Sequence, residues 1–256
     1  MKAIWTGAIG FGLVNIPVKL YSATEESSLD LDMLDKKDHS HIKFKRVNEK
    51  TGKEVAWTDI IKGFNYKGKY VVLDDKDFEK AQPEKTKIIS IDQFVKAEEI
   101  DSVYYETPYF VEPQKNGEAA YALLRDALVK TGMVGLGTFV MRNKEVLGLL
   151  KPYTDLIIFQ RLRFAEELRK ADDLAIPKRN VKPAELKMAV TLIEQLSQKL
   201  NIAAYKDTYS EKLMKIIESK AKGRKINVPE MKIVYNKSQD LMEQLKASLS
   251  AKKKVS

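Results

Sequence analysis

Residues 3–24 read AIWTGAIGFGLVNIPVKLYSAT, and this stretch decides the fold of the chain. It is rich in Ile, Val, Leu and aromatic residues, as buried β-strands are, and its glycines are spaced as bulges or close backbone contacts require. Pro17 interrupts it, so the strand must bend or lie at a sheet edge there. Lys19 is the only charged residue between Lys2 and Glu25. Such a lone cation either reaches solvent or faces a ligand.

The composition bounds the class of protein. A chain of 256 residues can bury a sizeable core and can hold one large or two small domains. It has no cysteine, which excludes disulfides and thiolate chemistry and favours a cytoplasmic location; the family resemblance given below implies that the protein is nucleoid-associated there. We see no signal peptide and no apolar run of roughly 18–20 residues, so we expect no membrane partner.

The charge is placed unevenly along the chain. Of the net charge of +9, residues 181–256 carry +8 and residues 1–180 carry +1. Within the first part, residues 41–70 hold eight Lys and Arg against three acidic residues. A basic excess favours nucleic acid or an acidic surface as a partner, although a solvated surface explains it equally well.

The hydrophobic periodicity predicts an α+β fold. Period-two patterns indicate strands over 42–47, 69–73, 86–95, 103–111 and 155–159, and a hairpin of 133–141 with 145–150. Residues 48–52 indicate a hairpin loop. A helix is predicted over about 118–130, with Tyr121, Leu124 and Leu128 on one face and Gly132 as its stop.

The period changes to 3.6 from Pro183 onward, where apolar residues recur at helical spacing from Leu186 to Leu200. We therefore place a domain boundary within 165–183. The segment Thr208-Tyr209-Ser210-Glu211 is a capping-box pattern, and Gly223 follows the helix that it begins. A last amphipathic helix is predicted over 240–249.

No arrangement of residues indicates an enzyme. The glycine clusters at Gly7–Gly12 and Gly132–Gly137 do not have the spacing of a nucleotide-binding loop, and bulges and turns explain them. His39 and His41 could lie on one side of a strand as metal ligands do. They are the only histidines, and there is no cysteine to complete a site. We expect neither a metal nor a cofactor.

Several cations are candidates for nucleic-acid binding. Alternation over 42–47 places Lys43, Lys45 and Arg46 toward phosphates and Phe44 in the core, or alternatively marks an edge strand that lysines protect from aggregation. Arg142 and Lys144 lie at a predicted hairpin tip. The remaining candidates, which could equally serve solubility, are Lys19, Lys36, Lys37, Lys222, Arg224, Lys225, Lys252, Lys253 and Lys254.

The last predicted helix is a candidate for partner binding. Its apolar stripe is Leu241, Leu245 and Leu249, and Asp240 precedes it. A stripe this short does not sustain an isolated helix, so the helix must dock on this protein or on another one.

Several segments in order along nearly the whole chain resemble the prokaryotic Ku family, the DNA-end-binding proteins of bacterial non-homologous end joining. They are residues 3–24, 44–47, 61–64, 68–73, 109–111 and 120–128. The resemblance implies a β-barrel core with an extended bridge over residues 1–178 and a helical region over 179–256. It also implies a non-enzymatic homodimer that closes a ring around double-stranded DNA ends.

The same resemblance implies a second partner. In this family the C-terminal part recruits a multifunctional ATP-dependent DNA ligase, and residues 205–209 and 240–249 resemble that part. Without the resemblance, the residues favour a basic RNA- or DNA-binding adaptor with an open surface and a docking tail. A nuclease is disfavoured, because no set of metal-binding carboxylates and histidines is evident.

Overall fold

The structure is a computed structural model that describes residues 1–81, 87–172, 174–176, 180–224 and 241–251. The chain divides into two compact units. The first comprises Met1–Glu26 and Leu31–Lys170, and the second comprises Ser27–Asp30 and Ala171–Ser256. Each unit is described by itself.

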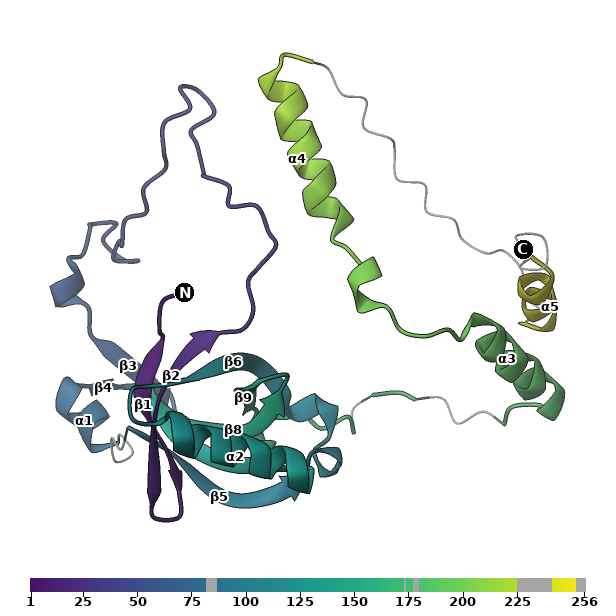
Figure 1. Cartoon of the computed structure of the whole chain (residues 1–256). Coiled ribbons are helices and arrows are strands. Elements are labelled where there is room, and N and C mark those ends of the chain that lie inside the picture. The colour runs from purple at the N-terminus through teal and green to yellow at the C-terminus, as the bar shows by residue number, and fades with distance from the viewer. Residues whose placement is uncertain (82–86, 173, 177–179, 225–240, 252–256) are drawn as a thin grey trace. The chain divides into compact units, whose positions relative to one another are not determined.

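The first unit is built on a closed β-barrel (Figure 1). Its strands are β1 (Trp5–Phe11), β2 (Val14–Ser22), β5 (Ile88–Lys96), β6 (Tyr105–Pro113), β7 (Met133–Met141), β8 (Lys144–Tyr153) and β9 (Leu156–Leu162). The order around the barrel is β1-β2-β6-β9-β8-β7-β5. The neighbours pair antiparallel except β1 and β5, whose parallel pairing closes the barrel. The predicted α+β class with a β-barrel core is therefore confirmed.

The opening stretch forms the β1–β2 hairpin. Ile16, Val18 and Leu20 of β2 are fully buried, and the residues between them lie toward the other face. Pro17 lies opposite Ala8 of β1, whereas pairing with β6 begins only at Val18. On the β6 side, Pro17 therefore lies at the end of the ladder, as the sequence predicted. Because proline has no N–H, no backbone donor is left without a partner at this position.

Helix α2 (Glu118–Thr131) packs against the barrel through Tyr121, Leu124 and Leu128, which are buried as predicted. Gly132 ends it in the left-handed conformation, with φ at 66°. The buried Tyr121 hydroxyl donates to the Val111 carbonyl at 2.8 Å and accepts from the Ile157 N–H at 2.7 Å. This side chain thereby ties α2 to β6 and β9, and burial raises its pKa.

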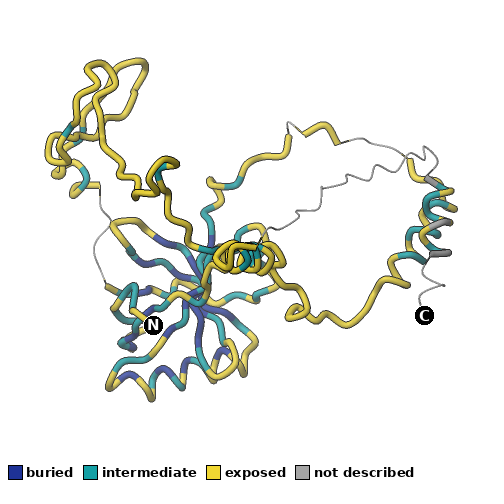
Figure 2. The backbone as a smooth tube through the Cα atoms, turned by 90° about the horizontal axis from the view of Figure 1, so that it is seen from above, coloured by how far each residue is buried: buried dark blue, intermediate teal, exposed yellow. Residues whose placement is uncertain are grey.

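Between β2 and β5 the first unit makes a long excursion from the barrel, and we call its residues 31–81 the arm (Figure 1). It contains β3 (Lys62–Tyr66), β4 (Lys69–Leu73) and the short helix α1 (Asp75–Lys80). Strands β3 and β4 form a separate two-stranded sheet and, among the described residues, pair with no other strand. Figure 2 shows that the buried residues gather in the barrel, while the arm is almost wholly exposed.

The strand predicted over residues 42–47 is wrong. Only an isolated bridge between Val47 and Glu54 forms there, and the side chain of Phe44 is 81% exposed instead of lying in the core. The alternation of residue types is that of a strand, but a strand also needs a neighbour along its length. The hairpin loop after it is confirmed, because Asn48 and Gly52 are joined by a backbone hydrogen bond of 2.8 Å.

The second unit holds α3 (Pro183–Leu196), α4 (Thr208–Ala221) and α5 (Leu241–Ala251), and α3 and α5 contact each other. Helix α3 ends at Leu196, before the predicted Leu200. The predicted capping box is also wrong, because the cap of α4 is Asp207, whose carboxylate accepts from the N–H groups of Tyr209 and Ser210. Asp207 lies one residue before Thr208, the cap that the sequence predicted, and its carboxylate accepts from both of these N–H groups.

Among the residues that the structure describes, none of the helices is long and apolar enough to cross a membrane.

We predict that Tyr121→Phe lowers the free energy of unfolding by about 1–3 kcal/mol, because it leaves a buried carbonyl and a buried N–H unpaired. Chemical denaturation followed by tryptophan fluorescence measures the change. Tyr153→Phe, at a tyrosine that is 52% exposed, is the matched control and should have almost no effect. Equal stability of the two variants would contradict the role given to the Tyr121 hydroxyl.

Candidate nucleic-acid interface

The arm carries an exposed concentration of positive charge. In β3 and β4 every residue except Leu73 is exposed, and residues 41–70 hold the excess of five positive charges. Exposed lysine and arginine side chains contact phosphates without reading base sequence. The arm therefore has the charge and the exposure that binding to a nucleic-acid backbone requires.

The three cations predicted within 42–47 are exposed, but they differ in their contacts. Lys45 Nζ lies 2.7 Å from a carboxylate oxygen of Glu54, and the Arg46 guanidinium lies 4.4 Å from the ring centroid of Trp57. Lys43 makes no ion pair within the described part of the chain. Of the three, Lys43 is thus the most available to a phosphate, and Arg46 is the one that stacking orients.

A second group of cations lies at the turn between β7 and β8. Arg142 and Asn143 adopt the left-handed conformation, with φ of 52° and 64°, which is the geometry of a tight two-residue hairpin. The hairpin predicted here is confirmed. The turn projects Arg142 and Lys144 from one end of the barrel strands.

The structure brings this hairpin tip together with the arm. Arg142, Asn143 and Lys144 line a hollow of about 650 Å³ with Lys62 of β3 and with α1. Lys62 Nζ lies 4.8 Å from the ring centroid of Phe78 on α1. The carboxylates of Asp75 and Glu79 also line the hollow, so its charge is mixed. The sequence counts Lys62 within the basic segment 41–70 but did not single it out as a site residue, because nothing in its local pattern links β3 to a turn so much later in the chain.

The other predicted DNA-binding cations do not join this group. Lys19 lies half-buried on β2, opposite Glu112 of β6 in the strand register. Lys36 and Lys37 lie in a turn of the arm, where the Asp35 carboxylate accepts from the Lys37 N–H at 2.7 Å. Lys222 and Arg224 follow α4 in the second unit, and Lys225, Lys252, Lys253 and Lys254 lie outside the described residues.

The predicted partner-binding helix is present as α5. Leu245 and Leu249 are half-buried, and the helix contacts α3 within the same unit. Asp240 lies outside the described residues, and so does the side chain of Leu241. Docking of this helix on its own chain therefore accounts for at least part of its apolar stripe.

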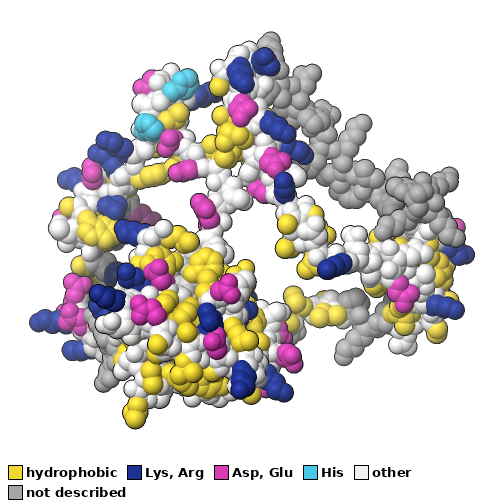
Figure 3. Space-filling view, viewed as in Figure 1, with side chains coloured by type: hydrophobic (Ala, Val, Ile, Leu, Met, Phe, Trp, Pro, Cys, Tyr) yellow, Lys and Arg dark blue, Asp and Glu magenta, His cyan; other side chains and the backbone are white. Residues whose placement is uncertain are grey.

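His39 and His41 lie on the arm, and their side chains are visible in Figure 3. Throughout the described ranges, the structure contains no group of three or more histidine, cysteine, aspartate or glutamate residues that could hold a metal ion.

Sequence reasoning also missed the exposed apolar side chains of the arm. All of its aromatic residues except Phe78 are between 58% and 81% exposed, and they are Phe44, Trp57, Phe64, Tyr66 and Tyr70. Figure 3 shows apolar side chains on the surface of this region among the charged ones. The sequence does contain a sign of these side chains, because many aromatic residues occur in a segment rich in lysine. The number of aromatic residues alone, however, does not distinguish a buried core from an exposed interface.

The comparisons with known proteins agree with this architecture. Residues 10–188 match the family model described as the Ku70/Ku80 beta-barrel domain. The chain belongs to the Ku family. It is 38% identical to the non-homologous end joining protein Ku of Coxiella burnetii, over 99% of this chain and 96% of that one. It is 40% identical to the Archaeoglobus fulgidus protein of the same name, over 99% of this chain and 100% of that one. The Bacillus subtilis Ku protein is 38% identical, over 97% of this chain and 82% of its own length.

Membership in the Ku family confirms the resemblance seen in the sequence and makes this a protein of non-homologous end joining. The matched region contains the end of β1, the other six barrel strands in full, and the whole arm between β2 and β5. The cations of the arm and of the β7–β8 turn are therefore part of the family domain and not of an appended tail.

We predict that Arg142→Ala combined with Lys144→Ala weakens binding to duplex DNA. The slope of log K against log salt concentration should fall by roughly one for each phosphate that the variant no longer neutralises. Fluorescence anisotropy at a series of salt concentrations measures both quantities. Lys130→Ala combined with Lys170→Ala is the matched control, since both lysines are exposed and lie in the barrel unit. An unchanged slope in the first variant would remove the hairpin tip from the interface.

Proposed function

We propose that this protein binds the ends of double-stranded DNA as a non-enzymatic homodimeric ring, without sequence specificity, and recruits an ATP-dependent DNA ligase. The observation that carries the proposal is the joining of the barrel hairpin to the basic arm, where Lys62, Arg142 and Lys144 line one hollow. Cations on two separate elements can follow a phosphate backbone, which is the sequence-independent part of any DNA complex.

End specificity then comes from topology. A closed ring that contacts only phosphates can be loaded on a duplex where the duplex ends, whereas an open basic surface binds anywhere along it. The arm supports a ring, because it leaves the barrel after β2, returns to it at β5 and is exposed over most of its residues. The arm is our candidate for the extended bridge of this family.

The homodimer is supported by the apolar surface of the arm. Trp57, Ile61 and Phe64 are 62–70% exposed, although they follow one another closely along the chain. A monomer rarely exposes so many large apolar side chains in one segment, and such segments usually mark an interface. In a two-fold pair the same surface is used by both subunits.

The ligase partner is supported by the resemblance of residues 205–209 and 240–249 to the C-terminal part of the family. In the second unit, α3 contacts α5 and still exposes Leu186, Val190 and Ile193 by 44–65%. We propose that the ligase contacts this helical pair and that α5, by packing on α3, holds the exposed apolar side chains of α3 in place for the ligase.

A gel shift on a single plasmid, used once linearised and once as a covalently closed circle, tests the ring. We predict binding to the linear form alone, with a steep dependence on salt concentration. Both forms have the same base pairs, so composition cannot explain a difference. Equal binding to both forms would replace the ring with the open-surface adaptor.

Sedimentation velocity of the free protein tests the homodimer. We predict a dimer for the unaltered chain and a shift toward the monomer for Trp57→Asp combined with Phe64→Asp, because a buried carboxylate at an interface is costly. Leu123→Asp is the matched control, because Leu123 is 68% exposed on α2, outside the arm. A dimer that survives the double substitution would locate the interface elsewhere.

A further inference from the structure

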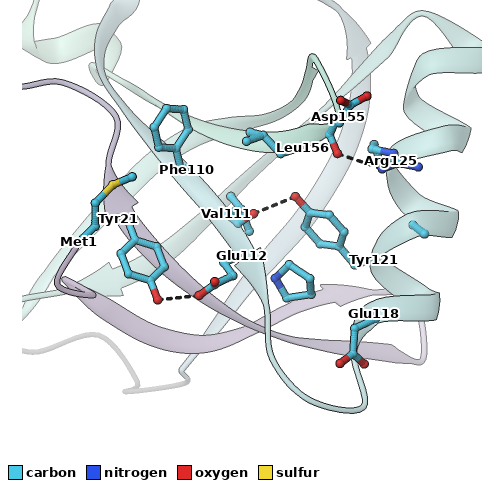
Figure 4. A pocket seen from close by; sticks show the side chains of 12 residues that line it. Met1, Tyr21, Phe110, Val111, Glu112, Glu118, Tyr121, Arg125, Asp155 and Leu156 are labelled. Atoms are coloured by element: carbon cyan, nitrogen blue, oxygen red, sulfur yellow. Dashed lines mark hydrogen bonds between the residues drawn. The ribbon is translucent and has the colours of Figure 1, made fainter.

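The barrel has a cavity on its outer face that the proposed function does not use. It has a volume of about 700 Å³ and lies between β2, β6, the first turns of α2 and the β8–β9 turn (Figure 4). All the described residues that line it belong to the barrel unit. None of the predicted DNA-binding cations that the structure describes is among them. Lys19, which lies opposite Glu112 in the strand register, does not line the cavity.

The floor of the cavity is apolar. Phe110, Pro113, Ala122 and Leu156 are half-buried, so each of them packs partly on the barrel and leaves part of its surface facing the cavity. The ring of Tyr121 completes the floor, and its hydroxyl is already engaged by the Val111 carbonyl and the Ile157 N–H. The floor therefore offers apolar contact and few free hydrogen-bonding groups.

The rim of the cavity is acidic. Glu112, Glu118 and Asp155 contribute carboxylates from β6, α2 and the β8–β9 turn, and all three residues are exposed. The Tyr21 hydroxyl donates to a carboxylate oxygen of Glu112 at 2.6 Å, and this contact holds that carboxylate at the rim.

Arg125 is the only lysine or arginine that lines the cavity within the described residues, and its guanidinium is occupied. It donates to the Asp155 carbonyl at 2.9 Å, and it pairs with the Asp126 carboxylate at 2.8 Å. An incoming anion would meet three carboxylates and a guanidinium that already has partners. The cavity therefore repels phosphate and attracts cations, although the protein as a whole is basic.

We propose that this cavity binds a linear segment of a partner protein in which lysine or arginine residues flank a bulky apolar side chain. The carboxylates come from three elements that surround the floor. A ligand must therefore place positive charge on more than one side of an apolar group. An extended basic–apolar–basic peptide does so, with its apolar side chain on the floor and its cations at Glu112, Glu118 and Asp155. The proposal does not depend on DNA binding.

The test is selection of peptides on the full-length protein from a displayed library of random dodecapeptides. Ala122→Trp, which fills the cavity and leaves its charge unchanged, serves for counter-selection. We expect the enriched peptides to carry lysine or arginine on both sides of a large apolar residue. Enrichment of acidic or neutral peptides, or equal recovery on the Ala122→Trp variant, would overturn the proposal.

An enriched peptide, labelled with fluorescein, then measures the role of the rim by anisotropy. We expect Glu112→Gln combined with Glu118→Gln to weaken its binding by about tenfold or more, because both charges complement the ligand. Glu98→Gln combined with Glu99→Gln is the matched control, since these exposed carboxylates do not line the cavity. Equal loss in both variants would show a general charge effect and overturn the site. Circular dichroism and thermal unfolding confirm that each variant is folded.

Discussion

The parallel pairing of β1 with β5 is the constraint on which the rest of the structure depends. It joins Ala8, Ile9 and Gly10 to Ile88, Ile89 and Ser90, and without it the barrel would have two free edges. Because β5 follows the arm in the sequence, this pairing also fixes where the arm returns. The Lys87 carbonyl accepts from the Ala8 N–H at 2.8 Å, and the Ala23 N–H donates to the Pro108 carbonyl at 3.3 Å. These bonds hold the chain to the barrel just after β2 and just before β5.

A core of this kind explains how the protein can carry an arm that buries almost nothing. The barrel supplies its own stability through fully buried side chains such as Ile9, Leu20, Ile89 and Phe159. Close approach of the strands adds to this, because a side chain at Gly137 would collide with the Ser90 carbonyl. The arm is therefore free to present charge and apolar surface, which the proposed ring and the proposed homodimer both require.

The charges are separated between two parts of the barrel unit. Cations gather on the arm and at the β7–β8 turn, while carboxylates surround the cavity beside α2. The first group suits phosphates, and the second suits a basic peptide. On our two proposals the unit binds DNA with one surface and a protein segment with another. Because the two surfaces have opposite charge, they attract different ligands and do not compete for the same one.

Local pattern was enough to predict most of the strands, the helix over 118–130 and the β7–β8 hairpin, because period and turn residues are properties of neighbouring residues. The family resemblance likewise rests on consecutive residues such as 3–24. Pattern failed at Phe44, whose strand has no neighbour, and at Asp207, a stronger cap than the residues after it. It also placed Lys19 among the DNA contacts without revealing that Glu112 lies opposite.

The tertiary structure alone decided which distant residues share a site. Lys62 meets Arg142 and Lys144 only because β5 closes the barrel beside β1 and returns the arm near the β7–β8 turn. Glu112, Glu118 and Asp155 surround one apolar floor only because α2 packs across β6 and β9. Charge in the sequence states how many cations and carboxylates there are, whereas the three-dimensional path of the chain determines which of them act on the same ligand.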